Sequence, residues 1–236
     1  MALSHDAATE GGTFTTTTPF TFLHTPVAFP VGVVVLVSQA DATERIVAPN
    51  VTYGGVALNS GTTLADAAGE HGRVYMFSHP VVTIPSGPQT VSIGHDGNSV
   101  VKHVVCVTIT GAGTVRLQTS SLFGGLDVAN PSINLTSPRL SLGYGVLFSG
   151  HDDVASITEA VTQTRMFSVD FGTKVAVYSR TLTPATGTIL SWTAASEDTA
   201  STGAAMAEEP NVEHAALDSG FISRLSQRYR RRRQEF

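Results

Sequence analysis

Short segments in which apolar and polar residues alternate recur along this 236-residue chain, and they constrain its fold more than any other feature. In one of them Phe167, Val169 and Phe171 fall on one side, while Ser168 and Asp170 fall on the other. Successive side chains of a β-strand point to opposite faces of a sheet, so this pattern predicts strands buried on one face. The 30 threonines favour strands further, because β-branched residues lose rotamer freedom in helices.

Turn residues separate these segments at short, fairly even spacing. The chain has 22 glycines and 11 prolines, and turn signals include "HDGN" at 95–98, "GAG" at 111–113 and "PATG" at 184–187. Ten or more short strands with such punctuation are typical of a sandwich. The sequence therefore predicts an all-β protein, an antiparallel β-sandwich that is jelly-roll-like, with a short C-terminal helical, Arg-rich segment.

Two adjacent glycines stand between two strand-like runs in "NVTYGGVALN", residues 50–59. A tight hairpin or bulge requires positive φ angles, which cost a residue with a Cβ about 1–2 kcal/mol. Tyr53, Gly54 and Gly55 are therefore predicted to form a structural turn at which the chain reverses.

Composition and charge divide the chain into three parts. Residues 1–13 are polar and are expected to form a flexible N-terminal arm, and residues 14–208 are expected to form one β-sandwich domain. Six acidic residues and no Lys or Arg lie between Glu197 and Asp218, whereas six arginines and one glutamate follow from Arg224 on. Such a charge asymmetry is typical of an appended tail, so residues 209–236 are interpreted as an acidic linker and a basic amphipathic tail.

The tail combines an apolar stripe with its arginines. Leu217, Phe221, Leu225 and Tyr229 recur at steps of four, the spacing of an amphipathic helix that needs a surface to dock on. The candidate partner-binding residues are Phe221, Leu225, Arg228, Tyr229, Arg230, Arg231, Arg232 and Arg233. Three interpretations stay open: docking on an acidic protein surface, contact with DNA, and a solvated tail without a partner. The apolar stripe favours docking on a protein.

The residues that could carry catalysis or bind metal form no recognised motif. The eight histidines lack metal-site spacing, and a loop calcium site at Asp152 and Asp153 is no better an explanation than turn chemistry. Cys106, the one cysteine, is expected to be a buried small hydrophobe. No enzyme activity, catalytic residue, metal or cofactor is predicted. No apolar run approaches the ~20 residues of a membrane span, and the N-terminus has no secretory signal pattern.

Four segments in chain order carry a resemblance to a known family. They are "FPVGVVVLVSQADATERIVAPNVTYGGVALN", "GRVYMFSHPVVTIPSGPQTVSIG", "HVVCVTITGAG" and "TLTPATGTILSWTAASEDTASTGAAMAEE". Together they resemble a β-sandwich module of minor tail and other virion proteins of tailed bacteriophages, especially those of actinobacteria. The resemblance covers about residues 14–208 and implies that Tyr53, Gly54 and Gly55 are a recurrent structural turn. It does not extend to the Arg-rich end.

The resulting hypothesis is a structural protein of a tailed-bacteriophage virion, most consistent with a minor tail protein making repeated subunit contacts. Its expected partners are other virion proteins and further copies of itself, and its location is the virion, assembled in the host cytoplasm. The alternatives are a capsid decoration protein and a carbohydrate-binding or host-adhesion module. Tyr53, Tyr75, Tyr144 and Trp192 are expected to be core or turn residues, which weakens the carbohydrate alternative.

Overall fold

The computed structural model describes residues 2–15, 19–41, 43, 45–46, 50–65, 72–79, 84–95, 100–113, 115–137, 139–150, 154–194 and 197–208. The first nine strands are β1 (Ser4–Phe14), β2 (Phe20–His24), β3 (Gly32–Gln39), β4 (Val51–Tyr53), β5 (Val56–Ala57), β6 (Asn59–Ala65), β7 (Arg73–Ser78), β8 (Gln89–Ile93) and β9 (Lys102–Thr110). The others are β10 (Val115–Val128), β11 (Ser132–Asn134), β12 (Ser141–Ser149), β13 (Thr158–Glu159), β14 (Gln163–Asp170), β15 (Val175–Thr181), β16 (Ile189–Thr193) and β17 (Glu197–Glu208). A 3-10 helix spans Val154–Ser156.

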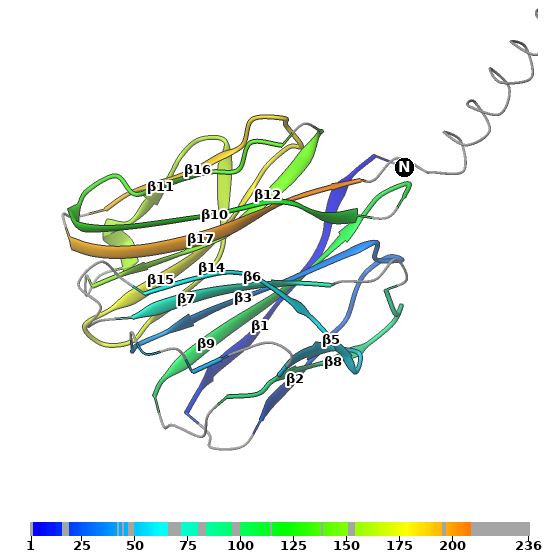
Figure 1. The fold of residues 1–236 in the computed structure, drawn as a ribbon, viewed down its shortest axis with the longest axis horizontal. Coiled ribbons are helices and arrows are strands. Elements are labelled where there is room, and N and C mark those ends of the chain that lie inside the picture. Colours follow the sequence, from blue (N-terminus) through cyan, green and yellow to red (C-terminus); the bar gives the residue numbers. More distant parts are fainter. Residues whose placement is uncertain are drawn as a thin grey trace, which may run out of the picture.

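These strands form four antiparallel sheets stacked as layers, which confirms the predicted all-β antiparallel sandwich (Figure 1). Sheet I has the order β2-β8-β4-β5, and sheet II has β1-β9-β3-β7-β6. Sheet III has the order β10-β17-β12-β15-β14, and sheet IV has β11-β16-β13. No helix among the described residues has the length and apolar character needed to cross a membrane. The predicted C-terminal helix lies outside the described residues.

An apolar core fills each of the three spaces between neighbouring sheets. All eight residues of β3 are buried: Val34 and Leu36 pack in the core between sheets II and III, whereas Val35 and Val37 pack toward sheet I. On the other side of sheet III, Leu147 belongs to the core shared with sheet IV. The continuous apolar run of β3 is therefore explained by burial of both faces of its sheet.

The strand order of sheets I and II recurs in sheets IV and III, so the chain contains the same topology twice in tandem. The first half runs from β1 to β9 and the second from β10 to β17. In each half the first strand pairs with the last strand, and the last strand also pairs with the third. The third strand then pairs with the seventh strand in the first half and with the sixth in the second. The equivalent orders are β1-β9-β3-β7 and β10-β17-β12-β15 in the central sheets, and β2-β8-β4 and β11-β16-β13 in the outer ones. Each half is thus a two-sheet jelly roll. The region 14–208 therefore holds four sheets rather than one two-layer sandwich, and β1 of the first unit begins before it, at Ser4.

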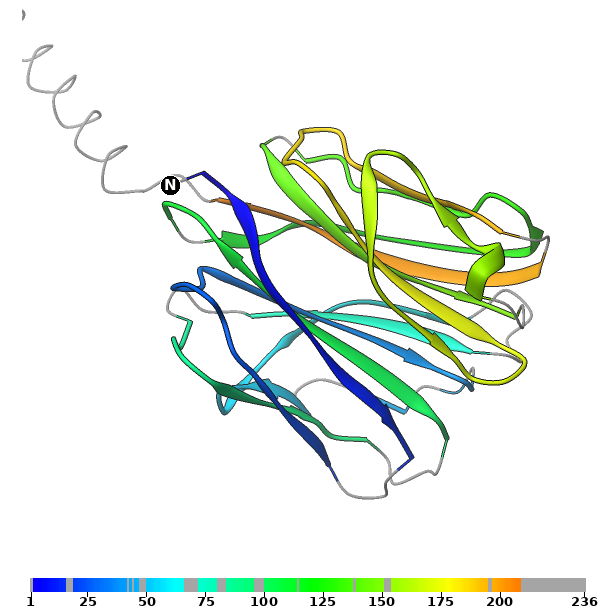
Figure 2. The ribbon, with the colours of Figure 1, turned by 180° about the vertical axis from the view of Figure 1, so that it is seen from behind.

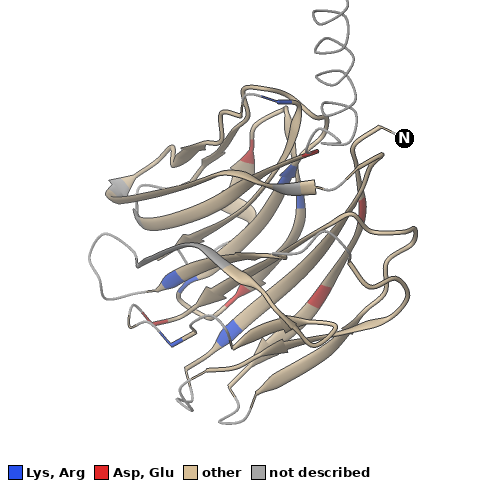
Figure 3. Ribbon diagram, turned by 45° about the vertical axis from the view of Figure 1, so that its right-hand side comes forward, with Lys and Arg blue, Asp and Glu red and all other residues tan. Residues whose placement is uncertain are grey.

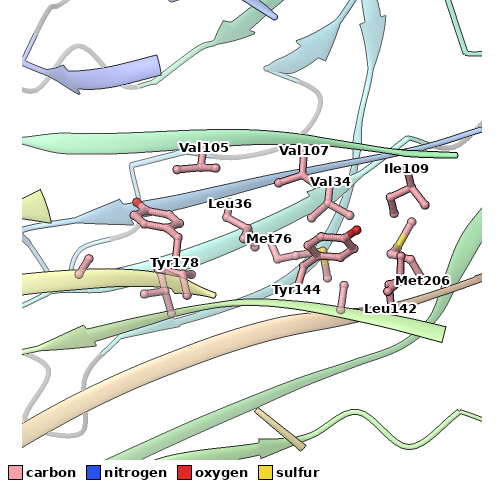
Figure 4. Packing of buried hydrophobic residues seen from close by; sticks show 14 of the residues in the cluster. Val34, Leu36, Met76, Val105, Val107, Ile109, Leu142, Tyr144, Tyr178 and Met206 are labelled. Carbon is pink, nitrogen blue, oxygen red and sulfur yellow. The ribbon is translucent and has the colours of Figure 1, made fainter. Parts of the chain in front are cut away.

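The two halves face each other through sheets II and III. Figure 4 shows the rings of Tyr144 and Tyr178 lying between the strands of these sheets, beside Val34, Leu36 and Met76. Strand β17 contributes the small residues Ala200 and Ala204 to this region, whereas its Gly203 lies on the other face of sheet III, where an added Cβ would lie 2.6 Å from Ile133 Cδ1 and from the Tyr144 backbone oxygen. Small side chains here let neighbouring backbones approach closely, so β17 can pack in the middle of sheet III.

The N-terminus departs from the expectation of a flexible arm over residues 1–13. Ser4–Phe14 forms β1, which pairs with β9 from Ser4 opposite Thr110 to Phe14 opposite Lys102. Figure 2 shows β1 in blue alongside β9. Backbone hydrogen bonds to a buried neighbour hold this polar segment, although its composition alone does not suggest a strand. The correction moves the start of the folded unit to Ser4.

Tyr53, Gly54 and Gly55 lie where β4 turns into β5. Gly54 has φ of 55° and Gly55 has φ of 79°, and Tyr53 pairs with Val56 across the two-residue loop. Positive φ at both central positions is the requirement of the tight hairpin turns that match strand twist. Tyr53 itself is fully buried in the core between sheets I and II. The glycines are therefore needed for chain reversal, and the tyrosine for packing.

One side chain ties the two halves together by polar contacts inside the central core. The hydroxyl of Tyr178 in β15 accepts hydrogen bonds from the Ser38 backbone N–H (3.0 Å) and the Ser38 hydroxyl (2.7 Å), and donates to the His103 carbonyl oxygen (2.9 Å). Tyr178 and Ser38 are fully buried, and burial raises the pKa of Tyr178. The second jelly roll thereby satisfies polar groups of the first.

We expect Tyr178→Phe to lower the free energy of unfolding by about 1–3 kcal/mol, because it leaves buried groups of Ser38 and His103 without their partner. Tyr144→Phe is the matched control: the Tyr144 hydroxyl makes only a 3.5 Å contact with His5 Nδ1, so its loss should cost less. Urea unfolding followed by the fluorescence of Trp192 measures both. Equal losses in the two variants would contradict the bridging role of Tyr178.

Candidate assembly surface

A short apolar loop projects from the first jelly roll between β2 and β3. In this loop, residues 25–31, Val27 is 84% exposed and Phe29 is 82% exposed. The flanking Pro26 and Pro30 are both buried. Proline fixes its own φ angle, so two buried prolines restrict the backbone on either side of the exposed residues. The sequence thus presents two apolar side chains on a constrained support, here called the apolar loop.

A carboxylate from the neighbouring strand β1 holds the apolar loop in place. The Asp6 Oδ2 atom accepts a hydrogen bond from the Val27 N–H (3.2 Å), and Oδ1 accepts one from the Ala28 N–H (3.0 Å). Hydrogen bonds to an ionised acceptor are stronger than those between neutral groups. The tip of the apolar loop is therefore anchored to the same strand that was expected to be a flexible arm.

Beneath the apolar loop, a buried histidine connects three strands. His24 in β2 contacts the Thr9 hydroxyl through Nδ1 (2.8 Å) and the Thr108 hydroxyl through Nε2 (3.1 Å). The Thr108 hydroxyl donates its proton to Asp6 Oδ2 (2.9 Å), so its oxygen accepts from the His24 Nε2–H. His24 Nδ1 then accepts from Thr9. These directions are those of a neutral imidazole with its proton on Nε2.

Burial keeps His24 in that neutral form. Desolvation lowers the pKa of His24 to about 4, although the nearby Asp6 acts in the opposite direction. His5 at the start of β1 behaves alike: burial, followed by the positive charge of Arg180, lowers its pKa to about 4. His24 is fully buried and both of its ring nitrogens have partners. Its geometry therefore suits positioning of the apolar loop, not proton transfer to a substrate.

The surroundings make this loop a stronger contact candidate than a scattered exposed hydrophobe. Leu23, on the adjacent β2, is also exposed, so apolar side chains precede and occupy the loop. Charged side chains are few along the strands of the described residues (Figure 3), in line with the 14% charged residues of the whole chain. Isolated exposed Leu or Val residues are normal on protein surfaces, but an aromatic residue on a constrained loop is a typical anchor at interfaces.

The remaining sequence candidates fall into two groups. The partner-binding residues of the tail lie outside the described residues, namely Phe221, Leu225, Arg228, Tyr229, Arg230, Arg231, Arg232 and Arg233. His71, His151, Asp152 and Asp153 also lie outside them. Within the described part of the chain, no group of three or more His, Cys, Asp or Glu side chains could hold a metal ion.

The expected core residues can be placed. Tyr53, Tyr75, Tyr144 and Trp192 are all buried, which confirms that they are packing residues. Cys106 is also buried, and burial raises its thiol pKa. The apolar loop was not among the predicted sites, although "HTPVAFPVG" carries a signal for it: a phenylalanine and a valine between two prolines, directly after a strand.

A second surface feature is a pocket of about 330 Å³ at one end of the second jelly roll. It is lined by Thr162, Thr181, Thr183, Ala185, Gly187, Thr188 and Ile189. The Thr181 hydroxyl accepts a hydrogen bond from the Gly143 N–H (3.0 Å), so its oxygen is already engaged. The lining is neutral and rich in hydroxyl groups, and the volume is near the lower limit of small-molecule sites.

The fold and these surfaces define a class of protein: a tandem jelly roll that presents an apolar loop and a neutral, threonine-lined pocket. No family model and no curated protein matches the chain. Among solved structures, Cucumber Necrosis Virus is similar at 13% identity and a TM-score of 0.28, over 86% of this chain and 71% of that one. A lectin from Pleurotus ostreatus in complex with GalNAc gives 8% identity and a TM-score of 0.24, over 87% of this chain and 82% of that one. At these TM-scores neither similarity carries an argument about function.

The neutral histidines predict a loss of stability in mild acid. The pKa of His24 is about 4 in the folded chain and about 6.5 when unfolded, so between these values the unfolded chain binds more protons. The free energy of unfolding should therefore be maintained above pH 6.5 and fall as the pH decreases toward 4. Urea titrations at pH 7.5, 6 and 5 measure this. His24→Gln, which does not titrate, should show a smaller decrease over this range, and an unchanged decrease would assign the effect to other groups.

Proposed function

We propose that this chain is a structural subunit of a virion that joins neighbouring proteins through preformed surface elements. The observation that carries the proposal is the apolar loop, whose exposed Val27 and Phe29 are supported by buried prolines and by the Asp6 carboxylate. Ordering a loop upon binding costs free energy, and a loop that is already held in place avoids much of this cost. The hydrogen bonds from Asp6 through Thr108 to His24 connect the apolar loop to strands β1, β2 and β9. A loop held in this way would meet each neighbouring subunit in the same geometry.

The rest of the described chain supports a mechanical role in the same way. Both central sheets are buried on both faces, so the two jelly rolls form a layered body with little freedom to rearrange. A body of this kind transmits force and fixes the relative position of whatever binds its edges and loops. Its contribution to an assembly would be shape and contact area.

The tail of a tailed bacteriophage is the location we propose within the virion, on the basis of the sequence resemblance over residues 14–208. Decoration of the capsid is the competing location. The Arg-rich residues 228–233 would reach either an acidic protein surface or packaged DNA. Imaging of particles bearing a label on this chain separates tail from head. Absence of the chain from purified particles would overturn the proposal.

Binding of a saccharide is the second candidate function, and the neutral threonine-lined pocket is the observation that favours it. Its weakness is that Trp192 and four of the five tyrosines, Tyr53, Tyr75, Tyr144 and Tyr178, are buried and cannot stack on a sugar ring. A glycan array without a binding signal would remove this alternative.

Replacement of the apolar anchors tests the contact. We expect Val27→Ser combined with Phe29→Ser to reduce incorporation into particles at least tenfold without lowering the unfolding temperature, because both side chains are largely exposed in the free chain. Quantitative mass spectrometry of purified particles measures incorporation. The matched control is Val161→Ser, since Val161 is 93% exposed in the second jelly roll and should tolerate the change. Full incorporation of the double variant would exclude the loop as a contact.

Deletion of residues 213–236 tests whether the Arg-rich C-terminal segment is needed for incorporation into particles. The described strands end at Glu208, so the truncated chain should fold and show an unchanged unfolding temperature, yet it should fail to enter particles. The arginines could contact an acidic protein surface or DNA. Measuring DNA binding by the full and the truncated chain over a range of salt concentrations distinguishes these two partners. A steep salt dependence that disappears upon truncation would indicate contact with nucleic acid.

A further inference from the structure

The unpaired edges of the four sheets differ in how well they are protected from pairing with another chain. Exposed edges are templates for strand addition, and proteins protect them by short length, bulges, charges or proline. Most edges here have such protection: β5, β11 and β13 have two or three residues, and β2 has five. Strand β1 has two bulges and carries Asp6 and Glu10, β14 has a bulge next to Arg165, and β6 has a bulge between Ser60 and Thr63.

Strand β10 lacks these protections over its central part. It is 14 residues long, and among the strands that the structure describes it pairs with β17 alone, on one side. Its irregularities lie near its ends, between Leu117 and Thr119 and between Gly125 and Val128, so Thr119–Gly125 forms an uninterrupted seven-residue ladder. The stretch 117–126, "LQTSSLFGGL", contains no charged residue and no proline. Leu122 is 48% exposed and Leu126 is 60% exposed.

The hydrogen bonds to β17 show which residues of β10 face the open side. The carbonyl oxygens of Ser121 and Phe123 accept hydrogen bonds from hydroxyl groups of β17, at 3.3 Å and 3.4 Å. The N–H and C=O of one residue in an antiparallel strand point to the same side, and this side alternates along the strand. Ser120, Leu122 and Gly124 therefore direct their backbone groups toward the open edge.

We propose that β10 pairs with β10 of a second copy of this chain, in antiparallel orientation, about a two-fold axis at Leu122. This partner deepens the proposed structural function and rests on it. Leu122 is the central residue of Thr119–Gly125, so this register gives the longest ladder that includes no bulge. The two copies of sheet III would join into one continuous sheet.

The side chains of the segment suit this register. Residues directly opposite each other in an antiparallel pair lie on the same face, so the exposed Leu122 would contact its own counterpart. Ser120 would lie opposite Gly124, Thr119 opposite Gly125, and Ser121 opposite Phe123, so every pair away from the axis has a small residue on at least one side. No like charges meet within the paired segment. Leu122 against Leu122 at the axis is therefore the one pair of this register with a large side chain on both sides.

Sedimentation velocity of the full chain over a range of concentrations tests the pairing. We expect a dimer that forms as the concentration rises. Leu122→Lys introduces two opposed charges at the axis, and Ser120→Pro removes an outward N–H, so both variants should be monomeric with unchanged unfolding temperatures. Val161→Lys, the same kind of change at an exposed site away from β10, should leave the dimer intact. A wild-type chain that stays monomeric, or a dimer that persists in both β10 variants, would overturn the pairing.

Disulfide trapping tests the register. Leu122→Cys should form a disulfide-linked dimer upon oxidation, because opposed residues of a hydrogen-bonded antiparallel pair have Cα atoms about 5.5 Å apart, within disulfide range. Cys106 is buried and should not react. Val161→Cys is the control that should remain monomeric. Failure of trapping with normal incorporation of the chain into particles would overturn the pairing alone, whereas absence from particles would overturn the proposed function.

Discussion

The apolar contact between sheets II and III is the interaction on which the rest of this structure depends. Each jelly roll has an inner sheet that would expose valines and aromatic residues if it stood alone, and the other jelly roll covers it. The Tyr178 hydroxyl adds a polar requirement, because Ser38 and His103 find their partner across this boundary. The halves are therefore separate in topology but dependent on each other for burial.

This arrangement restricts where the chain can meet other molecules. Both faces of sheets II and III are covered, so those two sheets leave only their edges available for contact. Loops and edges are then the elements that can vary without disturbing the core. The apolar loop and β10 are elements of these two kinds, and each is supported by a strand of a central sheet: β1 holds the loop through Asp6, and β17 holds β10 through its backbone.

Many strands and turns could be predicted from local sequence pattern, but the division of the chain into two jelly rolls and the identity of the edge strands could not. Alternation identified strands such as β14, and the glycine pair identified the β4–β5 turn. Residues 197–208 fall within the predicted sandwich domain, but their pattern predicts no strand, and Glu197–Glu208 forms β17 in the middle of sheet III. Its small residues carry little apolar signal, because their role is close backbone approach. Likewise β1 is held by pairing with β9, and the apolar loop by an aspartate far away in sequence, and neither partner is visible in a local window.

The two proposed contacts have different symmetry, and this difference decides what they could build together. Pairing of β10 with itself is isologous, so it closes after two copies and by itself yields only dimers. The apolar loop has no such constraint, because Val27 and Phe29 can insert into a different surface on the neighbour. A heterologous contact repeats until it closes into a ring or continues as a filament. Since the loop belongs to the first jelly roll and β10 to the second, one contact can form while the other is already occupied. A chain with both contacts can therefore link dimers into a branched or layered array, whereas the β10 contact alone yields only dimers and the loop contact alone yields a single ring or filament.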